Sequence, residues 1–259
     1  VGYYGNSLGD HFGVGHIFLA GEAPGLFYGY VTQGIVQKED ITENGIKYIK
    51  QDGSVGYYQT VNKTTPVAGD VKYVDRNGDG VVDDNDRDII GNPNPDFTYG
   101  FQTKVSWKSL SLSASFNGVQ GRDILNVGNR YNNTPGTKSN NVTRKAFQNM
   151  WTDENPSNLY PKSTFVVQNM VMDRYVEDGS YLRCSDITLS YVLPAKWTNK
   201  IGIKNTSVYA SVKNAFVITD YSGYDPEVNS FAFDGLRPGV DMNSYPTPRS
   251  FVFGLNLTF

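Results

Sequence analysis

The sequence predicts an all-β fold, the C-terminal strands of a transmembrane antiparallel β-barrel with long extracellular loops. Five segments alternate apolar and polar residues over about the 9–11 residues that a barrel strand needs to cross a bilayer. Short and long connections alternate between them. Aromatic residues make up 14% of the chain, whereas all hydrophobic residues together reach only 39%, a balance typical of a sheet with one lipid-facing and one water-facing side.

The first two strands are expected at 97–107 and 110–120, joined by the short turn Lys108-Ser109. Rings and aliphatic side chains occupy alternate positions of the first strand, from Phe97 to Trp107, and polar residues or glycine stand between them. Successive side chains of a strand point to opposite faces, so this strand has one apolar and one polar face. The same alternation resumes with opposite parity after the turn, as an antiparallel hairpin requires.

Three further strands are expected at 181–193, 203–217 and 249–259, and Pro194 ends the first of them. The last strand has an apolar residue at every second position up to the aromatic ring of Phe259. This arrangement resembles the signal that barrel-assembly machinery recognises. The residues expected to form this membrane-assembly signal are Phe251, Phe253, Leu255, Leu257 and Phe259.

The connections predict which end of the strands faces which compartment. The turns at 108–109 and 194–202 are short, whereas the loops at 121–180 and 218–248 are long and rich in Gly, Asn, Pro and Tyr. Outer-membrane barrels combine short periplasmic turns with long extracellular loops. We therefore expect barrel strands over 97–259, a short helix at 141–152 within the first long loop, and an extracellular region of loops and short strands over 1–96.

Composition excludes several other classes of protein. The net charge of −3 offers no basic surface for nucleic acid. Cys184 is the only cysteine, so no internal disulfide is possible. A soluble β-sandwich would alternate too, but Ser, Thr, Gly, Gln and Lys dominate the polar faces and rings such as Trp107, Tyr191 and Phe216 lie near strand ends, which favours a barrel.

An acidic segment at 75–86 has the spacing of an EF-hand calcium loop, with Gly80 at its sharp turn. Asp75, Asn77, Asp79, Val81 (through its carbonyl), Asp83 and Asp86 would be the ligands. So many carboxylates repel one another unless a cation is present, which favours a structural Ca²⁺. The alternative is a solvated turn without an ion, because Asp, Asn and Gly favour turns anyway.

Several motifs together resemble the SusC/RagA family of TonB-linked outer-membrane proteins. Gly69-Asp70-Val71-Lys72-Tyr73-Val74-Asp75-Arg76-Asn77-Gly78-Asp79-Gly80 is similar to one family signature, and the run from Ile90 to Gly100 to the next. Further matches are Tyr181-Leu182-Arg183, the run 187–191, the run from Asn214 to Glu227, and the run from Tyr245 to Phe251. They cover most of 21–259 in the expected order.

The resemblance implies a 22-stranded barrel with a plugged lumen. It implies import of glycans or peptides across the outer membrane of a Gram-negative, Bacteroidetes-type bacterium. It also implies a SusD/RagB-like surface lipoprotein as a lid, and energy from TonB. The plug and the TonB-contacting segment are expected to lie outside this chain, which we interpret as a C-terminal part of such an importer.

No convergent catalytic set is apparent, so no enzyme activity is expected. Three loop aromatics, Tyr131, Trp151 and Tyr160, are candidates for stacking on a cargo, although for each one alone packing between the loops is the favoured interpretation. The alternative function is a secreted, soluble β-sandwich binding module with a dockerin-like calcium loop. That alternative predicts that the apolar strand faces are buried.

Overall fold

The computed structural model describes residues 2–3, 15–134, 141–163, 170–198 and 205–258. The chain forms two compact units, each assembled from separate stretches of sequence. The first unit contains 1–94, 123–177 and 228–244. The second unit contains 95–122, 178–227 and 245–259.

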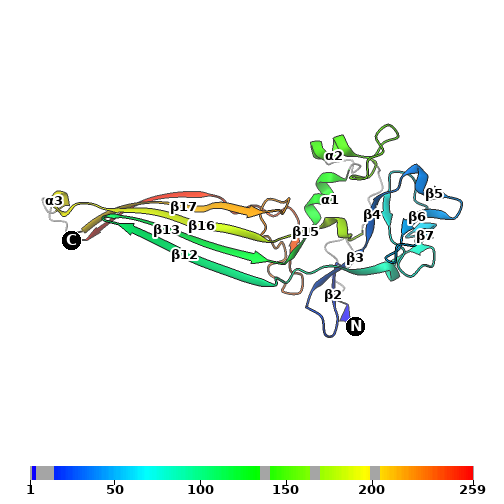
Figure 1. Ribbon diagram of the computed structural model, residues 1–259, viewed down its shortest axis with the longest axis horizontal. Coiled ribbons are helices and arrows are strands. Elements are labelled where there is room, and N and C mark those ends of the chain that lie inside the picture. Colours follow the sequence, from blue (N-terminus) through cyan, green and yellow to red (C-terminus); the bar gives the residue numbers. More distant parts are fainter. Residues whose placement is uncertain (1, 4–14, 135–140, 164–169, 199–204, 259) are drawn as a thin grey trace. The chain divides into compact units, whose positions relative to one another are not determined.

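The second unit is one antiparallel sheet of five long strands in the order β12-β13-β16-β17-β19, which lie side by side in Figure 1. The strands are β12 (Phe97–Trp107), β13 (Leu110–Gln120), β16 (Tyr181–Val192), β17 (Asn205–Thr219) and β19 (Ser250–Thr258). A four-residue helix, α3 (Ala195–Thr198), lies between β16 and β17. Every neighbouring pair is antiparallel, as the sequence pattern predicts.

The register of the sheet is regular between β12 and β13 and irregular at one place further on. Phe97 pairs with Gln120 and Trp107 with Leu110, which leaves Lys108 and Ser109 as a two-residue turn. Lys108 has a φ of 54°, in the left-handed region that such tight hairpin turns require. A β-bulge between Cys184 and Asp186 shifts the pairing of β16 with both of its neighbours.

The first unit contains short strands and most of the helices. Its strands are β1 (Gly2–Tyr3), β2 (His16–Phe18), β3 (Leu26–Tyr30), β4 (Thr32–Ile35), β5 (Ile41–Thr42), β6 (Gly45–Ile49), β7 (Val55–Tyr58), β8 (Thr60–Val61), β9 (Val71–Tyr73), β10 (Val81–Val82), β11 (Arg87–Gly91), β14 (Asp123–Asn126) and β18 (Val240–Asp241). Its helices are α1 (Val127–Asn133), α2 (Arg144–Asn149), and the 3₁₀ turns η1 (Lys38–Asp40), η2 (Asp84–Asp86) and η3 (Asp173–Tyr175). The strand β15 (Val176–Asp178) spans the boundary between the two units.

A tyrosine-rich core holds the first unit together. Tyr30, Tyr48, Tyr58 and Tyr73 are all buried in one cluster. Their hydroxyl groups reach partners, for example Tyr48 donates to the Asp75 carbonyl at 2.7 Å, as buried phenols usually do. Residues from the two long connections complete this cluster, and they are Leu125, Val127, Trp151, Met170, Val171, Met172, Tyr175 and Val240.

The two long connections therefore differ from open loops. The sequence divides the chain between 96 and 97, whereas the compact units assign 123–177 and 228–244 to the same unit as 1–94. The physical reason is that apolar residues in these stretches complete a core that the first 94 residues begin. The short helix expected at 141–152 is α2, Arg144–Asn149, whose N-cap Thr143 accepts a hydrogen bond from the Ala146 N–H.

Candidate functional site

The two faces of the five-stranded sheet differ in chemistry, and this difference is the main feature of the second unit. Register places apolar side chains of all five strands in common rows, such as Val105, Leu112, Leu189, Ala210 and Phe253. These rows stay uncovered. Phe101, Leu112, Leu189 and Phe253 are 51%, 46%, 45% and 79% exposed. A soluble sandwich would bury this face, so the exposed rows argue against the soluble binding module.

The last strand contributes to the same apolar face. Phe251, Phe253 and Leu255 pair with Val212, Ala210 and Val208 of β17, and Leu257 pairs with Thr206. All four of these apolar side chains of β19 are exposed. Phe259, the fifth residue of the predicted assembly signal, lies outside the described residues. Whether these residues act as an assembly signal stays a prediction.

The opposite face carries polar groups that bond to one another across strands. Asp186 of β16 accepts hydrogen bonds from Thr188 at 2.8 Å and from Ser211 of β17 at 2.7 Å. Lys213 of β17 forms an ion pair with the same carboxylate at 2.7 Å. On β12 and β13, Ser106 and Ser111 bond to each other at 2.8 Å. This face therefore suits a watery interior.

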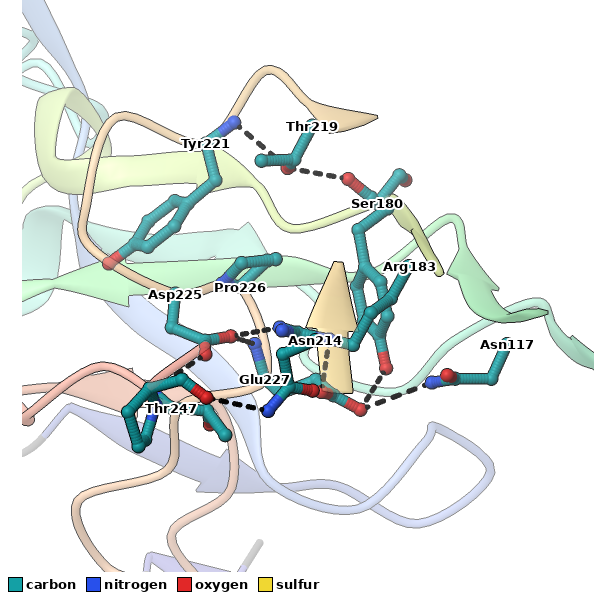
Figure 2. A network of polar contacts seen from close by, with 12 residues as sticks. Asn117, Ser180, Arg183, Asn214, Thr219, Tyr221, Asp225, Pro226, Glu227 and Thr247 are labelled. Atoms are coloured by element: carbon teal, nitrogen blue, oxygen red, sulfur yellow. Dashed lines mark hydrogen bonds and ion pairs between the residues drawn. The ribbon is translucent and has the colours of Figure 1, made fainter. Parts of the chain in front are cut away.

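The strongest polar network lies where β16 begins and β17 ends, and Figure 2 shows it. Arg183 donates from Nη2 to Asp225 Oδ1 at 2.5 Å, and its Nε lies 2.7 Å from Glu227 Oε2. The Tyr181 hydroxyl donates to Glu227 Oε1 at 2.7 Å. We call Tyr181, Arg183, Asp225 and Glu227 the Arg183 cluster. It fastens the segment that follows β17 onto the start of β16.

Backbone groups fix the acidic side of the Arg183 cluster. Asp225 accepts from the Glu227 N–H at 2.9 Å and from the Thr247 N–H at 3.2 Å. Burial opposes ionisation of Asp225, yet these two N–H groups and the Arg183 charge lower the pKa of its carboxyl below its ordinary value. Arg122 donates to the Pro226 carbonyl, and Asn117 of β13 reaches Glu227 at 3.4 Å. The segment 225–227 is thus held from several strands.

The acidic loop is closed by its own backbone. Asp75 accepts from the N–H groups of Gly78 and Gly80 at 2.7 and 2.8 Å. Asp86 accepts from the N–H groups of Arg76 and Asp83, both at 2.8 Å. The two carboxylates are 2% and 0% exposed. Asp86 Oδ1 accepts from the Asn77 N–H as well, at 3.3 Å, whereas the other three carboxylate oxygens each keep a second lone pair for a cation.

The other predicted ligands follow the same local pattern. Asn77 Oδ1 accepts from the Asp79 N–H, Asp79 Oδ1 from the Val81 N–H, and Asp83 Oδ1 from the Asn85 N–H, each at 2.8 Å. Within the described part of the chain, no three His, Cys, Asp or Glu side chains converge as a metal site requires. Burial raises the pKa of the Asp86 carboxyl, and the neighbouring Asp75 charge adds to this effect against three opposing backbone hydrogen bonds. Calcium therefore stays a prediction.

The three aromatic candidates have different surroundings. Trp151 is buried in the core of the first unit, where its Nε1 donates to Gln37 Oε1 at 3.0 Å, so its ring presents no face to a cargo. Tyr160 is half-buried and lines a cavity. Tyr131 lies in α1, and the structure does not describe its side chain.

Sequence reasoning gave no role to the Arg183 cluster. Its residues stand within the motifs 181–183 and 214–227, but a motif alone does not say which residues meet. The available signal was an arginine inside an alternating strand, which requires a partner when it is buried.

Among the described residues, no helix is long and apolar enough to cross a membrane.

No family model matches the chain. TonB-dependent receptor P3 of Formosa agariphila is 33% identical over 248 residues, which are 94% of this chain and 23% of the relative. TonB-dependent receptor SusC of Bacteroides thetaiotaomicron is 34% identical over 194 residues, 72% of this chain and 17% of the relative. The chain thus spans about a fifth of the curated relatives it matches.

Solved structures show the same fold. The RagAB peptide importer in its open-open state matches with a TM-score of 0.62 and 24% identity, over 96% of this chain and 24% of that chain. Another structure, titled as the RagAB peptide transporter, gives a TM-score of 0.64. The predicted fold of barrel strands is confirmed, whereas the closure of the barrel and the number of 22 strands stay predictions. The sequence relatives and the motifs agree, and the chain belongs to the SusC/RagA family of TonB-dependent receptors.

Proposed function

We propose that the protein to which this chain contributes imports glycans or peptides across the outer membrane of a Bacteroidetes-type bacterium. The two-faced sheet is the observation that carries this proposal. Its apolar rows are exposed on five neighbouring strands, while the other face joins Ser, Thr, Asp and Lys side chains. Such a sheet suits hydrocarbon on one side and a polar lumen on the other.

The relatives support the same proposal. P3 and SusC are both named TonB-dependent receptors, and the solved neighbours are titled as a peptide importer or transporter. None of these names is that of an enzyme. We infer that the parent protein takes energy from TonB, has a plug within the barrel, works with a SusD/RagB-like surface lipoprotein, and is not itself an enzyme. The RagAB titles name peptides, whereas the names of the sequence relatives state no cargo, so both cargo classes stay open for this protein.

Membrane fractionation and an uptake assay test the proposal together. The tagged parent protein should appear in the outer-membrane fraction and require detergent for extraction. Deletion of its gene should abolish growth on one oligomeric carbon source, a glycan or a peptide mixture, while growth on the corresponding monomer continues. Removal of TonB should have the same effect. A parent protein that is released in soluble form without detergent would overturn the proposal.

We further propose a structural Ca²⁺ for the loop at 75–86. The spacing of its oxygen donors supports this, together with two buried carboxylates whose mutual repulsion a divalent cation would remove. Asp75, Asn77, Asp79, Asp83 and Asp86 would hold the ion through side chains and Val81 through its carbonyl. The ion would fix the loop that precedes β11, and it would take no part in transport.

A further inference from the structure

A cavity of about 210 Å³ lies within the first unit. Residues of α1, α2 and η3 line it together with the segment 159–161. Ligand pockets for drug-sized molecules measure about 300–1,000 Å³, so this cavity fits one small unit of a longer molecule. The residues that matter for its chemistry are Asn129, Asn133, Lys145, Tyr160, Arg174 and Tyr175.

The charged residues that line this cavity are both cations. Lys145 is exposed on α2 and forms no ion pair with any described carboxylate. Arg174 donates from Nη2 to the Leu159 carbonyl, and its Nη1 is buried without a hydrogen-bond partner. The adjacent Asp173 carboxylate accepts from the backbone and hydroxyl of Thr32 instead. The positive charge beside the cavity is therefore not neutralised by the described lining.

A series of hydrogen bonds occupies the side-chain oxygens of Asn129 and Asn133 as acceptors. Thr143 Oγ1 donates to Asn133 Oδ1 at 2.5 Å, Asn133 Nδ2 donates to Asn129 Oδ1, and Asn129 Nδ2 donates to Glu177 Oε1 at 3.0 Å. Both amide oxygens therefore already accept a hydrogen bond. Each amide nitrogen carries two hydrogens, of which one bonds to a described partner, so each asparagine has a second N–H that can serve a ligand. The wall is consequently rich in donors and poor in acceptors.

We propose that this cavity binds a carboxylate group carried by one unit of the cargo. Lys145 and the two asparagine amides would donate to the carboxylate oxygens, and Arg174 would contribute its charge. Leu159, Tyr160, Pro161 and Tyr175 also line the cavity, and the rest of that unit would pack against their apolar surface. The inference rests on the proposed import function, because it names the chemical class of the cargo.

Calorimetric titration of the full-length protein in detergent tests the site. The probes are digalacturonate and N-acetyl-Ala-Ala, which share a carboxylate but come from the two possible cargo classes. Their neutral comparators are maltose and N-acetyl-Ala-Ala amide. Binding of at least one carboxylate probe, on the order of tenfold tighter than its neutral comparator, is expected from charge-assisted hydrogen bonds. Preference for one probe identifies the source of the carboxylate.

Variants decide whether the binding occurs in this cavity. Lys145→Gln and Arg174→Gln should each lower the affinity for the carboxylate probe on the order of tenfold. Lys47→Gln, which removes an exposed lysine of β6 outside the cavity, should leave binding unchanged. Because Lys145 is exposed, its substitution leaves the fold intact even if Arg174→Gln does not. Equal affinity of wild type and Lys145→Gln overturns the inference.

The outcome also separates this inference from the import function. If neither carboxylate probe binds more tightly than its neutral comparator while the cells still require the protein for growth on a neutral oligomer, the carboxylate site is wrong and import stands. If a carboxylate binds through Lys145 while deletion of the gene affects no carbon source, the site stands and import is wrong.

Discussion

Arg183 of β16 and Asp225, 42 residues further along the chain, form an ion pair of 2.5 Å, and their side chains are 6% and 8% exposed. The pair lies at the end of the sheet from which the long connections leave, since β13 ends and β16 begins there. A buried guanidinium of this kind requires a carboxylate partner. The pair therefore couples the position of the segment after β17 to the sheet.

Removing the carboxylate of this pair should destabilise the protein strongly. Asp225→Ala leaves the Arg183 charge buried without its main partner, and such changes cost about 3–5 kcal/mol. Glu227→Gln should cost less, because the Glu227 side chain is 39% exposed and water screens its interaction. Urea unfolding of the full-length protein in detergent measures both.

A matched control is available in an exposed ion pair. Lys38 and Asp153 also meet, at 2.6 Å, but both side chains are 65% exposed. Asp153→Ala should therefore cost no more than about 1 kcal/mol. Similar losses for Asp225→Ala and Asp153→Ala would show that the Arg183 cluster does not hold this end of the sheet.

Acid should weaken the same pair. The folded protein lowers the pKa of Asp225, so its contribution to stability is complete above the ordinary pKa of about 3.9 and is lost as pH falls through the lower folded value. The difference in unfolding free energy between wild type and Asp225→Asn should stay constant from neutral pH to about pH 5 and shrink below pH 4. A difference that does not change with pH would mean that Asp225 is not ionised in the pair.

The strands were predictable because their signal is local. Alternation with a period of two needs only neighbouring residues, and it places 97–107 and 110–120 where the structure has β12 and β13. The fourth strand, predicted at 203–217, continues to Thr219, and its first described residue is Asn205. Its pairing shifts opposite the bulge between Cys184 and Asp186, and sequence periodicity cannot show such a shift in a neighbouring strand.

The core of the first unit and the Arg183 cluster were not predictable in this way. Trp151 bonds to Gln37 from 114 residues away, and this contact removes it from the candidates for cargo binding. Arg183 and Asp225 belong to two motifs that the sequence shows separately. Contacts of this kind depend on how distant segments pack, and one sequence contains no local pattern that reports them.

The two faces of the sheet should respond differently to charge. Leu189→Arg places a cation on the apolar face, where a charge near the middle of a bilayer costs about 2–4 kcal/mol. Ser190→Arg, the next residue on the same strand, points to the polar face and should be tolerated. The measurement is the amount of folded, heat-modifiable protein in the outer membrane. Equal loss for both variants would contradict the assignment of the faces.

Calcium should stabilise the loop at 75–86 most at neutral pH. Because burial and the nearby Asp75 charge raise the pKa of Asp86, ionised Asp86 opposes folding above its folded pKa, and stability rises as pH falls through that value. A bound Ca²⁺ would offset this repulsion. Adding the ion after chelation should therefore raise the unfolding temperature at pH 7. The increase should become smaller at lower pH, where a proton on Asp86 removes the repulsion instead. Asp79→Asn keeps an acceptor for the Val81 N–H but removes one ligand charge, and should abolish the response. Asp153→Asn changes an exposed carboxylate outside the loop and should retain the response to calcium. An unfolding temperature that calcium leaves unchanged in the wild type would mean that backbone hydrogen bonds alone close the loop.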